Sequence, residues 1–281
     1  IKDKEKSSYY NGKRSKVLKY SIMENIKLPK VGRYLFLAEP FHCNFKGMLF
    51  PGHLGNHMLN AADFHSDERG YGMSKLLPQH KTWVLSRLVL EMQEMPKVYD
   101  KFYIETWVDG IMKFFTTRNY SVVSPKGKVF GYGKSIWALI DTDTRKPSDL
   151  LELNEGAILN YVEKEKECPI ENPSHVKIGK QANRIKSVKV SYSDIDMNGH
   201  VNSMKYLEHA LDIYSLDYWG KKALRRLEIA YIIEAYYGCT LHFYEEEVSS
   251  DHYHIRVTKS DESSEAETDV CRIAFIFEDN K

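Results

Sequence analysis

The hydrophobic positions in the first half of the chain follow a helical period and then a strand period. Leu54, Met58 and Ala62 recur at helical spacing and predict a helix over 54–64. Apolar or alternating runs separated by turn residues then predict strands at 83–92, 102–109, 114–123 and 129–140. A helix followed by strands that are joined through hairpins is an α+β pattern.

The second half of the chain repeats this order of elements. The patterns predict a strand at 188–192, a helix at 201–214, and strands at 226–233, 240–248, 252–259 and 270–277. Placing Val190 on Phe41 offsets the two halves by 149 residues through the helices. Placing Arg226 on Arg87 offsets the later strands by 139, and the loop after the helix absorbs the difference. We therefore interpret the chain as a duplicated α+β unit.

The same patterns divide the chain into four segments. We expect a disordered extension over 1–30, an N-terminal unit over 31–150, a connector over 151–186 and a C-terminal unit over 187–281. The first 22 positions hold seven Lys or Arg against two acids and lack helical periodicity. We interpret them as an upstream extension or a cloning remnant that precedes a start at Met23.

Composition narrows the function classes. Of the 281 residues, 42% are hydrophobic and 28% are charged, which is typical of a chain that buries a core. The chain lacks the run of about 18–20 apolar residues that membrane insertion requires. Its net charge of +1 gives no basic surplus for binding nucleic acid. Four cysteines without a CxxC pair fit a reducing compartment, so we expect a cytoplasmic protein.

The densest cluster of polar residues directly precedes the second predicted helix. Asp196, Asn198 and His200 alternate with Met197 and Gly199. In an extended chain alternate side chains point the same way, so we expect the three polar side chains to face one site. The free N–H groups of a helix N-terminus would stabilise an oxyanion there. A carboxylate, an amide and an imidazole in such a place indicate acyl transfer or hydrolysis.

A turn followed by a helix cap is the structural alternative for this cluster, because Asp and Asn favour such positions. A calcium loop is disfavoured. Positions 194–199 match the first half of an EF-hand loop, but Lys205 stands where the bidentate carboxylate is needed.

Other motifs are weaker. Residues 131–135 (GYGKS) suggest a phosphate loop, but Lys128 replaces its first glycine and no helix follows. His53 and His57 have the spacing of an HExxH zinc motif, but Leu54 replaces the glutamate. We interpret both histidines as ordinary surface or capping residues and expect no metal site.

The duplication favours a catalytic role because the polar set occurs in one copy only. The alignment pairs Asp196 with Gly47, Asn198 with Leu49, His200 with Pro51, and Glu234 with Met95. A structural cap would be equally useful in both copies. Glu234 lies in an aromatic and aliphatic segment that we read as a strand, so its carboxylate needs a buried polar partner unless it lies at a solvated edge.

The segment YSDIDMNGHVNSMKYLEH at 192–209 is similar to the D-x-N-x-H-V-N signature of the plant-type acyl-[acyl-carrier-protein] thioesterases. Supporting stretches are WVLSRLVLE at 83–91, ETWV at 105–108, SIW at 135–137 and TRK at 144–146. The chain resembles a bacterial member of this family from about position 34 to 277. The resemblance implies a tandem double hotdog, in which two long helices are each wrapped by an antiparallel sheet. It also implies catalysis in the C-terminal hotdog and an acyl pocket shaped by the N-terminal one.

Carried over by position, the catalytic set is Asp196, Asn198, His200 and Glu234. The implied reaction is hydrolysis of the thioester of fatty acyl-[acyl carrier protein], which releases a free fatty acid and ends chain elongation in fatty acid biosynthesis. Asp196 either attacks the carbonyl or acts as a base on water. Ala235 stands where plant members commonly have Cys, which disfavours a Cys nucleophile. The reaction needs no metal or cofactor, because the substrate carries its own phosphopantetheine.

An acidic carrier protein implies a local basic face on the enzyme. Candidate substrate- and carrier-binding residues are Trp83, Arg87, Lys113, Arg118, Arg145 and Lys146. An acyl-CoA thioesterase of the same fold and a non-enzymatic acyl-thioester sensor are the alternatives. A homodimer remains open, and we expect neither nucleic acid nor stable membrane insertion.

Overall fold

The computed structural model describes residues 28–179, 182–261 and 266–280. The predicted extension over 1–30 therefore lies outside the described residues up to position 27. In the part of the chain that is described, no helix is long and apolar enough to cross a membrane.

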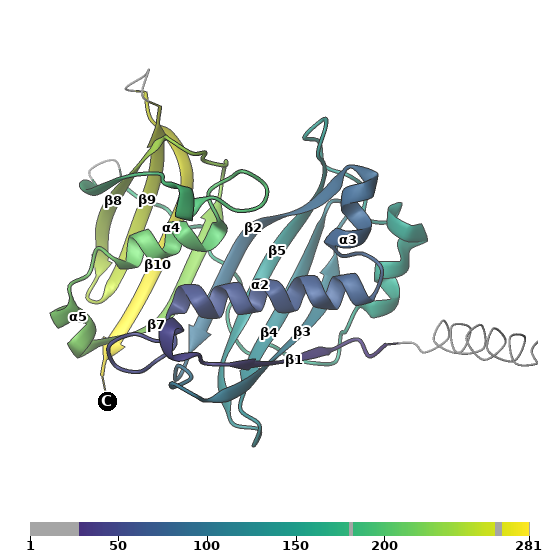
Figure 1. The fold of residues 1–281 in the computed structure, drawn as a ribbon, viewed down its shortest axis with the longest axis horizontal. Coiled ribbons are helices and arrows are strands. Elements are labelled where there is room, and N and C mark those ends of the chain that lie inside the picture. The colour runs from purple at the N-terminus through teal and green to yellow at the C-terminus, as the bar shows by residue number, and fades with distance from the viewer. Residues whose placement is uncertain (1–27, 180–181, 262–265, 281) are drawn as a thin grey trace, which may run out of the picture.

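The described strands form one antiparallel sheet in the order β1-β3-β4-β5-β2-β7-β10-β9-β8-β6 (Figure 1). Their bounds are β1 Gly32–Leu37, β2 Lys81–Met92, β3 Lys101–Ile111, β4 Phe115–Val123, β5 Val129–Asp141, β6 Asn183–Lys189, β7 Lys222–Tyr231, β8 Thr240–Ser249, β9 His252–Ser260 and β10 Thr268–Asp279. The strand that was predicted at 188–192 is observed a few residues earlier in the chain, as β6. Strand β1 was not predicted, because its run of apolar residues is short.

The strand order has an internal symmetry that reflects the duplication. The series β1-β3-β4-β5-β2 from the first half corresponds to β6-β8-β9-β10-β7 from the second. Strands β2 and β7 meet at the centre, where Val89 pairs with Glu228. The 139-residue offset makes these two positions equivalent. A pseudo-two-fold axis therefore passes between the central strands.

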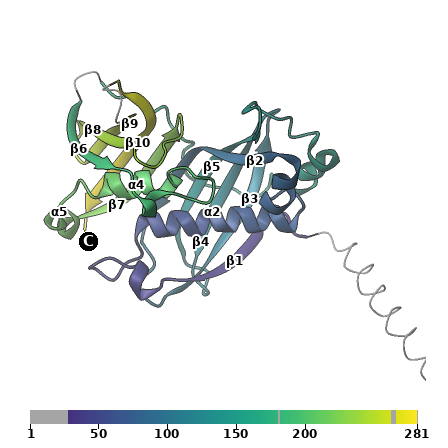
Figure 2. The same cartoon turned by 45° about the horizontal axis from the view of Figure 1, so that its top comes forward.

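Two helices lie on the same face of the sheet, α2 (Pro51–Glu68) and α4 (Ser203–Leu211) (Figures 1 and 2). They pack against each other where Gly55 faces Met204, a pair that the 149-residue offset makes equivalent. A Cβ atom on Gly55 would lie 2.3 Å from the Met204 sulfur, so a larger residue there would displace the buried Met204 side chain. Helix α4 begins later than predicted because the Asn202 side chain accepts a hydrogen bond from the Met204 N–H and caps it.

The remaining helical elements are short. They are α3 (Met73–Leu76), α5 (Leu216–Lys221) and the 3-10 turns η1 (Pro40–His42), η2 (Leu77–Gln79), η3 (Leu153–Tyr161) and η4 (Tyr192–Asp194). A continuous apolar core extends through both halves between the sheet and the helices α2 and α4, of which α4 is shorter than predicted. A smaller cluster that includes Tyr71, Leu139 and Ile158 packs beneath α3 and η3. Two such units sharing one sheet confirm the predicted α+β double hotdog.

Candidate active site

The segment from Ile195 to Val201 is a tight hairpin whose ends form an antiparallel bridge. The Gly199 N–H donates to the Asp196 carbonyl at 3.0 Å, and the Asp196 N–H donates to the His200 carbonyl at 2.8 Å. Gly199 has a φ of +78°, which glycine adopts without steric cost. The prediction of an extended segment with alternating side chains was therefore wrong, because the chain reverses direction here.

The Asp196 carboxylate stabilises this hairpin from within. Its Oδ1 accepts hydrogen bonds from the backbone N–H groups of Asn198 at 2.8 Å and His200 at 3.4 Å. Asn198 is exposed at the tip. The polar cluster was predicted to lie at a helix N-terminus with free N–H groups. This needs correction, because the Asn202 side chain caps α4 and accepts the hydrogen bond of the Met204 N–H. The sequence-based alternative of a turn plus a helix cap thus describes the backbone of this segment.

His200 and Glu234 lie together although 34 positions separate them in the chain. The Val201 N–H donates to the Ala235 carbonyl at 2.8 Å, which ties the hairpin to the segment after β7. The Ala235 N–H donates in turn to the hydroxyl of Tyr206 on α4 at 3.1 Å. As a result, His200 Nδ1 lies 3.7 Å from Glu234 Oε1.

Glu234 follows the end of β7 and does not belong to a strand, contrary to the prediction. Its carboxylate pairs with the Arg145 guanidinium, and the Tyr236 hydroxyl donates to its Oε2 at 3.4 Å. The Tyr236 ring also packs edge-on against the His200 imidazole, with the centroids 5.1 Å apart. Lys259 Nζ donates to the Glu234 carbonyl at 2.8 Å. The two contacts of the carboxylate itself are partly exposed to solvent, so the expected buried polar partner is not what the structure shows.

The sequence interpretation missed Tyr236 and the role of Arg145. Tyr236 follows Glu234 by two positions in an aromatic run, which is a weak signal by itself. Arg145 lies in the turn after β5, at a φ of +60°, and comes from the N-terminal half of the chain. The site therefore lies where the two halves meet, and both halves contribute to it.

The alternative motifs do not form the sites that they suggested. Asp194 of the calcium-like loop is buried, and its Oδ1 lies 2.9 Å from Nε2 of His209 on α4. Lys205, the cation at the last position of that loop, pairs with Glu208 at 2.7 Å. The phosphate-loop-like segment 131–135 lies inside strand β5.

Three of the predicted binding residues hold the fold together. Arg118 is only 3% exposed and contacts His65, Ser66 and Thr106, so its assignment to a docking surface was wrong. Arg87 donates to the Ser174 carbonyl at 2.9 Å and thereby holds the connector against the sheet. The Trp83 indole N–H donates to the Tyr71 carbonyl at 2.8 Å.

The other basic candidates are exposed and lie near one another. The Lys113 carbonyl accepts a hydrogen bond from Leu150, and the Lys146 carbonyl accepts one from Asp141, at the same end of the N-terminal half. Arg145 is the neighbour of Lys146 and reaches Glu234. Arg145 and its neighbour Lys146 thus lie beside the polar cluster, and Lys113 lies at the same end of the sheet, just before β4.

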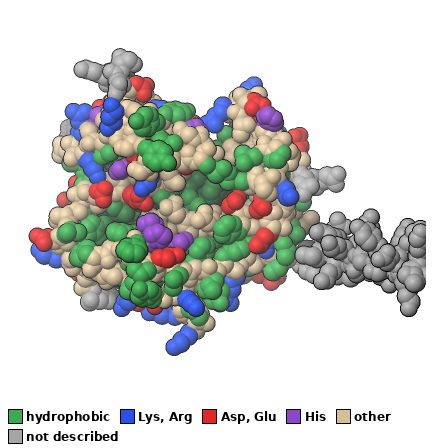
Figure 3. Space-filling view, viewed as in Figure 1, with side chains coloured by type: hydrophobic (Ala, Val, Ile, Leu, Met, Phe, Trp, Pro, Cys, Tyr) green, Lys and Arg blue, Asp and Glu red, His purple; other side chains and the backbone are tan. Residues whose placement is uncertain are grey.

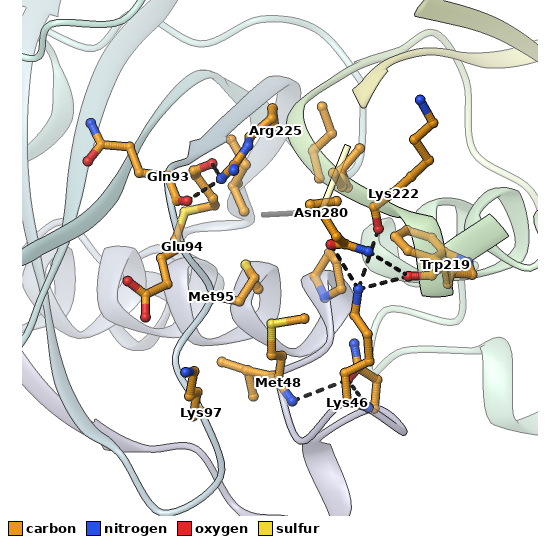
Figure 4. Close-up of a pocket in the computed structure, with 18 residues that line it drawn as sticks. Lys46, Met48, Gln93, Glu94, Met95, Lys97, Trp219, Lys222, Arg225 and Asn280 are labelled. Atoms are coloured by element: carbon orange, nitrogen blue, oxygen red, sulfur yellow. Dashed lines mark hydrogen bonds between the residues drawn. The ribbon is translucent and has the colours of Figure 1, made fainter. Parts of the chain in front are cut away.

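A pocket of about 450 Å³ lies at the opposite end of the β2–β7 pair (Figure 4). Leu49, Pro51 and Met95 line it, and these are the positions that the alignment pairs with Asn198, His200 and Glu234. Figure 4 shows Lys46 reaching across to the second half, where its Nζ donates to the Trp219 carbonyl at 2.8 Å. The copy without the polar set therefore forms a pocket at the pseudo-symmetric position, where apolar side chains lie among charged ones such as Lys46 and Arg225.

Comparisons with known proteins agree with this arrangement. The family model of the acyl-ACP thioesterase N-terminal domain matches residues 43–153, and that of the C-terminal domain matches 178–277. The crystal structure of an acyl-ACP thioesterase from Bacteroides thetaiotaomicron is 44% identical with a TM-score of 0.81, over 89% of this chain and 98% of that one. The 12:0-ACP thioesterase from Umbellularia californica shares the fold at 17% identity, with a TM-score of 0.78 over 91% of this chain and 100% of that one.

Curated plant relatives match over a shorter region. Oleoyl-acyl carrier protein thioesterase 2, chloroplastic, from Arabidopsis thaliana is 28% identical over 160 residues, which cover 50% of this chain and 44% of that protein. Palmitoyl-acyl carrier protein thioesterase, chloroplastic, from Gossypium hirsutum is 24% identical over 188 residues, or 63% and 46% of the two chains. The chain thus spans less than half the length of these relatives. With both domain models and the Bacteroides structure matched, the chain belongs to the acyl-ACP thioesterase family.

Proposed function

We propose that this protein hydrolyses the thioester of fatty acyl-[acyl carrier protein] and releases a free fatty acid, which ends chain elongation. The observation that carries the proposal is the cluster of His200, Glu234 and Arg145, which forms at only one of the two pseudo-equivalent positions among the described residues. Pro51 and Met95 occupy the equivalent positions in the other half, and neither can titrate. Titratable side chains at one of two pseudo-equivalent positions, and apolar ones at the other, suit a single reaction centre in a duplicated fold.

Asp196 and water supply the nucleophile in this proposal. The backbone N–H groups of Asn198 and His200 both donate to Oδ1 of Asp196. We propose that Oδ2 accepts a proton from the attacking water. The water oxygen adds to the carbonyl carbon, and the carbon–sulfur bond then breaks. Direct attack by the carboxylate, giving an anhydride that water hydrolyses, is the alternative with the same products.

The remaining polar groups act on the other atoms of the thioester. The exposed carboxamide of Asn198 donates to the oxyanion, because the helix amide of Met204 is already capped. Glu234 orients His200, which in its protonated form gives a proton to the departing sulfur and is reprotonated by the proton that Asp196 took from water. A thiol has a pKa of about 8.5, so the leaving group needs little acid catalysis. The substrate brings its own phosphopantetheine arm, and the scheme uses neither metal nor cofactor.

Carrier binding fits the surface beside the site. The exposed group of Lys113, Arg145 and Lys146 would meet an acidic carrier protein. Ile232 and Tyr237, which are 49% and 71% exposed, offer apolar contacts for the pantetheine arm and the acyl chain. The site is complete within one chain, so a homodimer would bring together two complete sites. We place the reaction in the cytoplasm, where four free cysteines suit reducing conditions.

Hydrolysis of palmitoyl-carrier protein and palmitoyl-CoA at matched concentrations tests the proposal. We expect faster turnover of the carrier-bound substrate, with an advantage that shrinks as salt is raised and charged docking is screened. A preference for palmitoyl-CoA at every salt concentration would indicate an acyl-CoA thioesterase. Binding of both thioesters without cleavage would indicate a sensor and would refute hydrolysis.

A further inference from the structure

Three side chains with metal-binding atoms converge at the start of the N-terminal half, far along the chain from the polar cluster. Glu39 directly precedes the 3-10 turn η1, His42 is the last residue of that turn, and His57 comes from the second turn of α2. Glu39 Oε2 lies 3.2 Å from His42 Nδ1 and 3.8 Å from His57 Nε2. One ligand atom from each of the three residues lies within 4.8 Å of the other two.

The His57 imidazole is held in place by the core. Its ring packs against Phe36 and Phe102, with centroid distances of 4.7 and 6.0 Å, and its side chain is only 13% exposed. Its Nε2 is buried and has no hydrogen-bond partner among the described residues. The atom faces the Glu39 carboxylate at 3.8 Å, which is too long for a hydrogen bond. A buried polar atom without a partner is costly, and a bound ion would satisfy it.

We propose that Glu39, His42 and His57 bind a divalent transition-metal ion, with zinc as the best fit. Imidazole nitrogen and carboxylate oxygen are zinc ligands at about 2.0–2.2 Å, which places tetrahedral ligand atoms about 3.3 Å apart. The observed separations of 3.2 and 3.8 Å lie on either side of this value. Two histidines and one glutamate leave a fourth position for water.

The location gives the ion a structural role. It would join η1 to α2 and so anchor the intervening loop, whose residues Asn44, Lys46 and Met48 line the 450 Å³ pocket. Figure 3 shows histidine side chains grouped with acidic ones on the face of the molecule that carries α2. His53 stacks on His42 with the ring centroids 4.0 Å apart and shields the same spot.

The second half of the chain lacks these ligands. The 149-residue offset pairs Glu39 with Val188, His42 with Ser191, and His57 with Tyr206. The cluster is therefore no general requirement of the duplicated fold. The sequence-based interpretation of His53 and His57 as surface or capping residues needs correction for His57, which packs into the core.

Titration of the EDTA-treated, dialysed full chain with Zn²⁺ tests the proposal. We expect one ion per chain by calorimetry, and weaker binding by at least about 10-fold in His42→Ala and in Glu39→Gln, since even outer-shell partners contribute that much. These two residues are partly exposed, so both variants should fold. His80→Ala is the matched control, because His80 pairs with Asp143 at 3.0 Å outside the cluster and should leave binding unchanged.

A second readout identifies the ligands directly. Co²⁺ in place of Zn²⁺ should give the visible absorption of a tetrahedral site in the wild-type chain and in His80→Ala, and lose it in His42→Ala. Saturating Zn²⁺ should also raise the Tm of the wild-type chain by about 5 °C, and that of His42→Ala by much less. Equal Zn²⁺ affinity in wild type and in both ligand variants would overturn the proposal, as would the absence of one-to-one binding to the wild-type chain.

Discussion

The guanidinium of Arg145 pairs with the carboxylate of Glu234, and the two residues come from opposite halves of the duplicated fold. The same carboxylate lies 3.7 Å from His200. The N-terminal half therefore lacks a polar set of its own but contributes one side chain to the polar set of the other half. The contact indicates that Arg145 positions Glu234, whereas its sequence suggested that it binds the carrier protein.

Replacing Arg145 distinguishes these two roles. In Arg145→Ala we expect kcat to fall about 10-fold on both palmitoyl-carrier protein and palmitoyl-CoA, because Glu234 loses the partner that orients it. Lys146→Ala, one position along, should raise KM for the carrier-bound substrate and leave kcat unchanged. Steady-state kinetics of both variants on both substrates provide the measurement. An Arg145→Ala defect confined to the KM of the carrier-bound substrate would assign this residue to docking alone.

Glu234→Gln tests whether only one of the two pseudo-equivalent positions is catalytic. The substitution keeps the shape of the side chain but removes the charge that faces His200 and Arg145. We expect kcat to fall about 100-fold, as for loss of an acid–base or orienting group. Met95→Leu, at the equivalent position of the other half, should change kcat by less than about 3-fold, since the swap conserves volume and polarity. Similar defects in the two variants would contradict a division of labour between the halves.

Substitution by alanine should have opposite effects at two helical glycines, one at the crossing of α2 and α4 and one in α5. Gly55→Ala would force a Cβ atom to within 2.3 Å of the Met204 sulfur and should destabilise the protein by about 1–3 kcal/mol. Gly220→Ala in α5 meets no heavy atom within 4 Å and should stabilise by about 0.5–1 kcal/mol through helix propensity. Urea unfolding of both variants measures the difference. A stabilised Gly55→Ala variant would show that α2 and α4 are not packed as described.

Buried His65 should make the stability of the fold sensitive to acid. Burial, followed by the charges of Arg118 and Arg69, lowers the pKa of His65 to about 2. Its Nδ1 lies 3.1 Å from Arg118, and its Nε2 lies 3.0 Å from the Lys30 carbonyl. The unfolded chain binds a proton on this residue below about pH 6.5, whereas the folded chain does not. Stability from this residue is therefore full above pH 6.5 and decreases as the pH falls toward 2.

The size of that effect can be measured by comparison with His65→Gln, which has no titrating ring. Between pH 7 and pH 5 we expect the free energy of unfolding of the wild-type chain to fall by about 2 kcal/mol more than that of the variant. Urea unfolding at the two pH values provides both numbers. Equal losses in the two proteins would show that His65 is not held neutral by its surroundings.

Local patterns predicted the secondary structure well and the geometry of the site poorly. The helix at 54–64 and the strands at 83–92 and 129–140 lie within α2, β2 and β5, because their periods extend over many residues. The alternation of Asp196, Asn198 and His200 looked like a strand. A left-handed Gly199 and the Asp196 carboxylate instead close a hairpin, and a period of two over five residues does not distinguish these structures.

Tertiary contacts explain the other errors. An arginine is usually exposed, and Arg118 gives no local sign that His65, Ser66 and Thr106 enclose it. The pairing of Arg145 with Glu234 joins positions 89 residues apart and depends on how the two halves meet. The equivalence of His200 with Pro51 could be obtained from sequence, because it needed only the offset between the repeats.

The central claim is that the hairpin carboxylate drives thioester hydrolysis, and Asp196→Asn tests it most directly. The asparagine oxygen can still accept the N–H groups of Asn198 and His200, so the hairpin should remain folded and the Tm should stay close to that of the wild-type chain. The decisive measurement is kcat on palmitoyl-carrier protein. We predict a fall of about 100-fold or more, because the amide can neither take a proton from water nor attack the carbonyl. A folded Asp196→Asn protein that turns over at the wild-type rate would contradict the account.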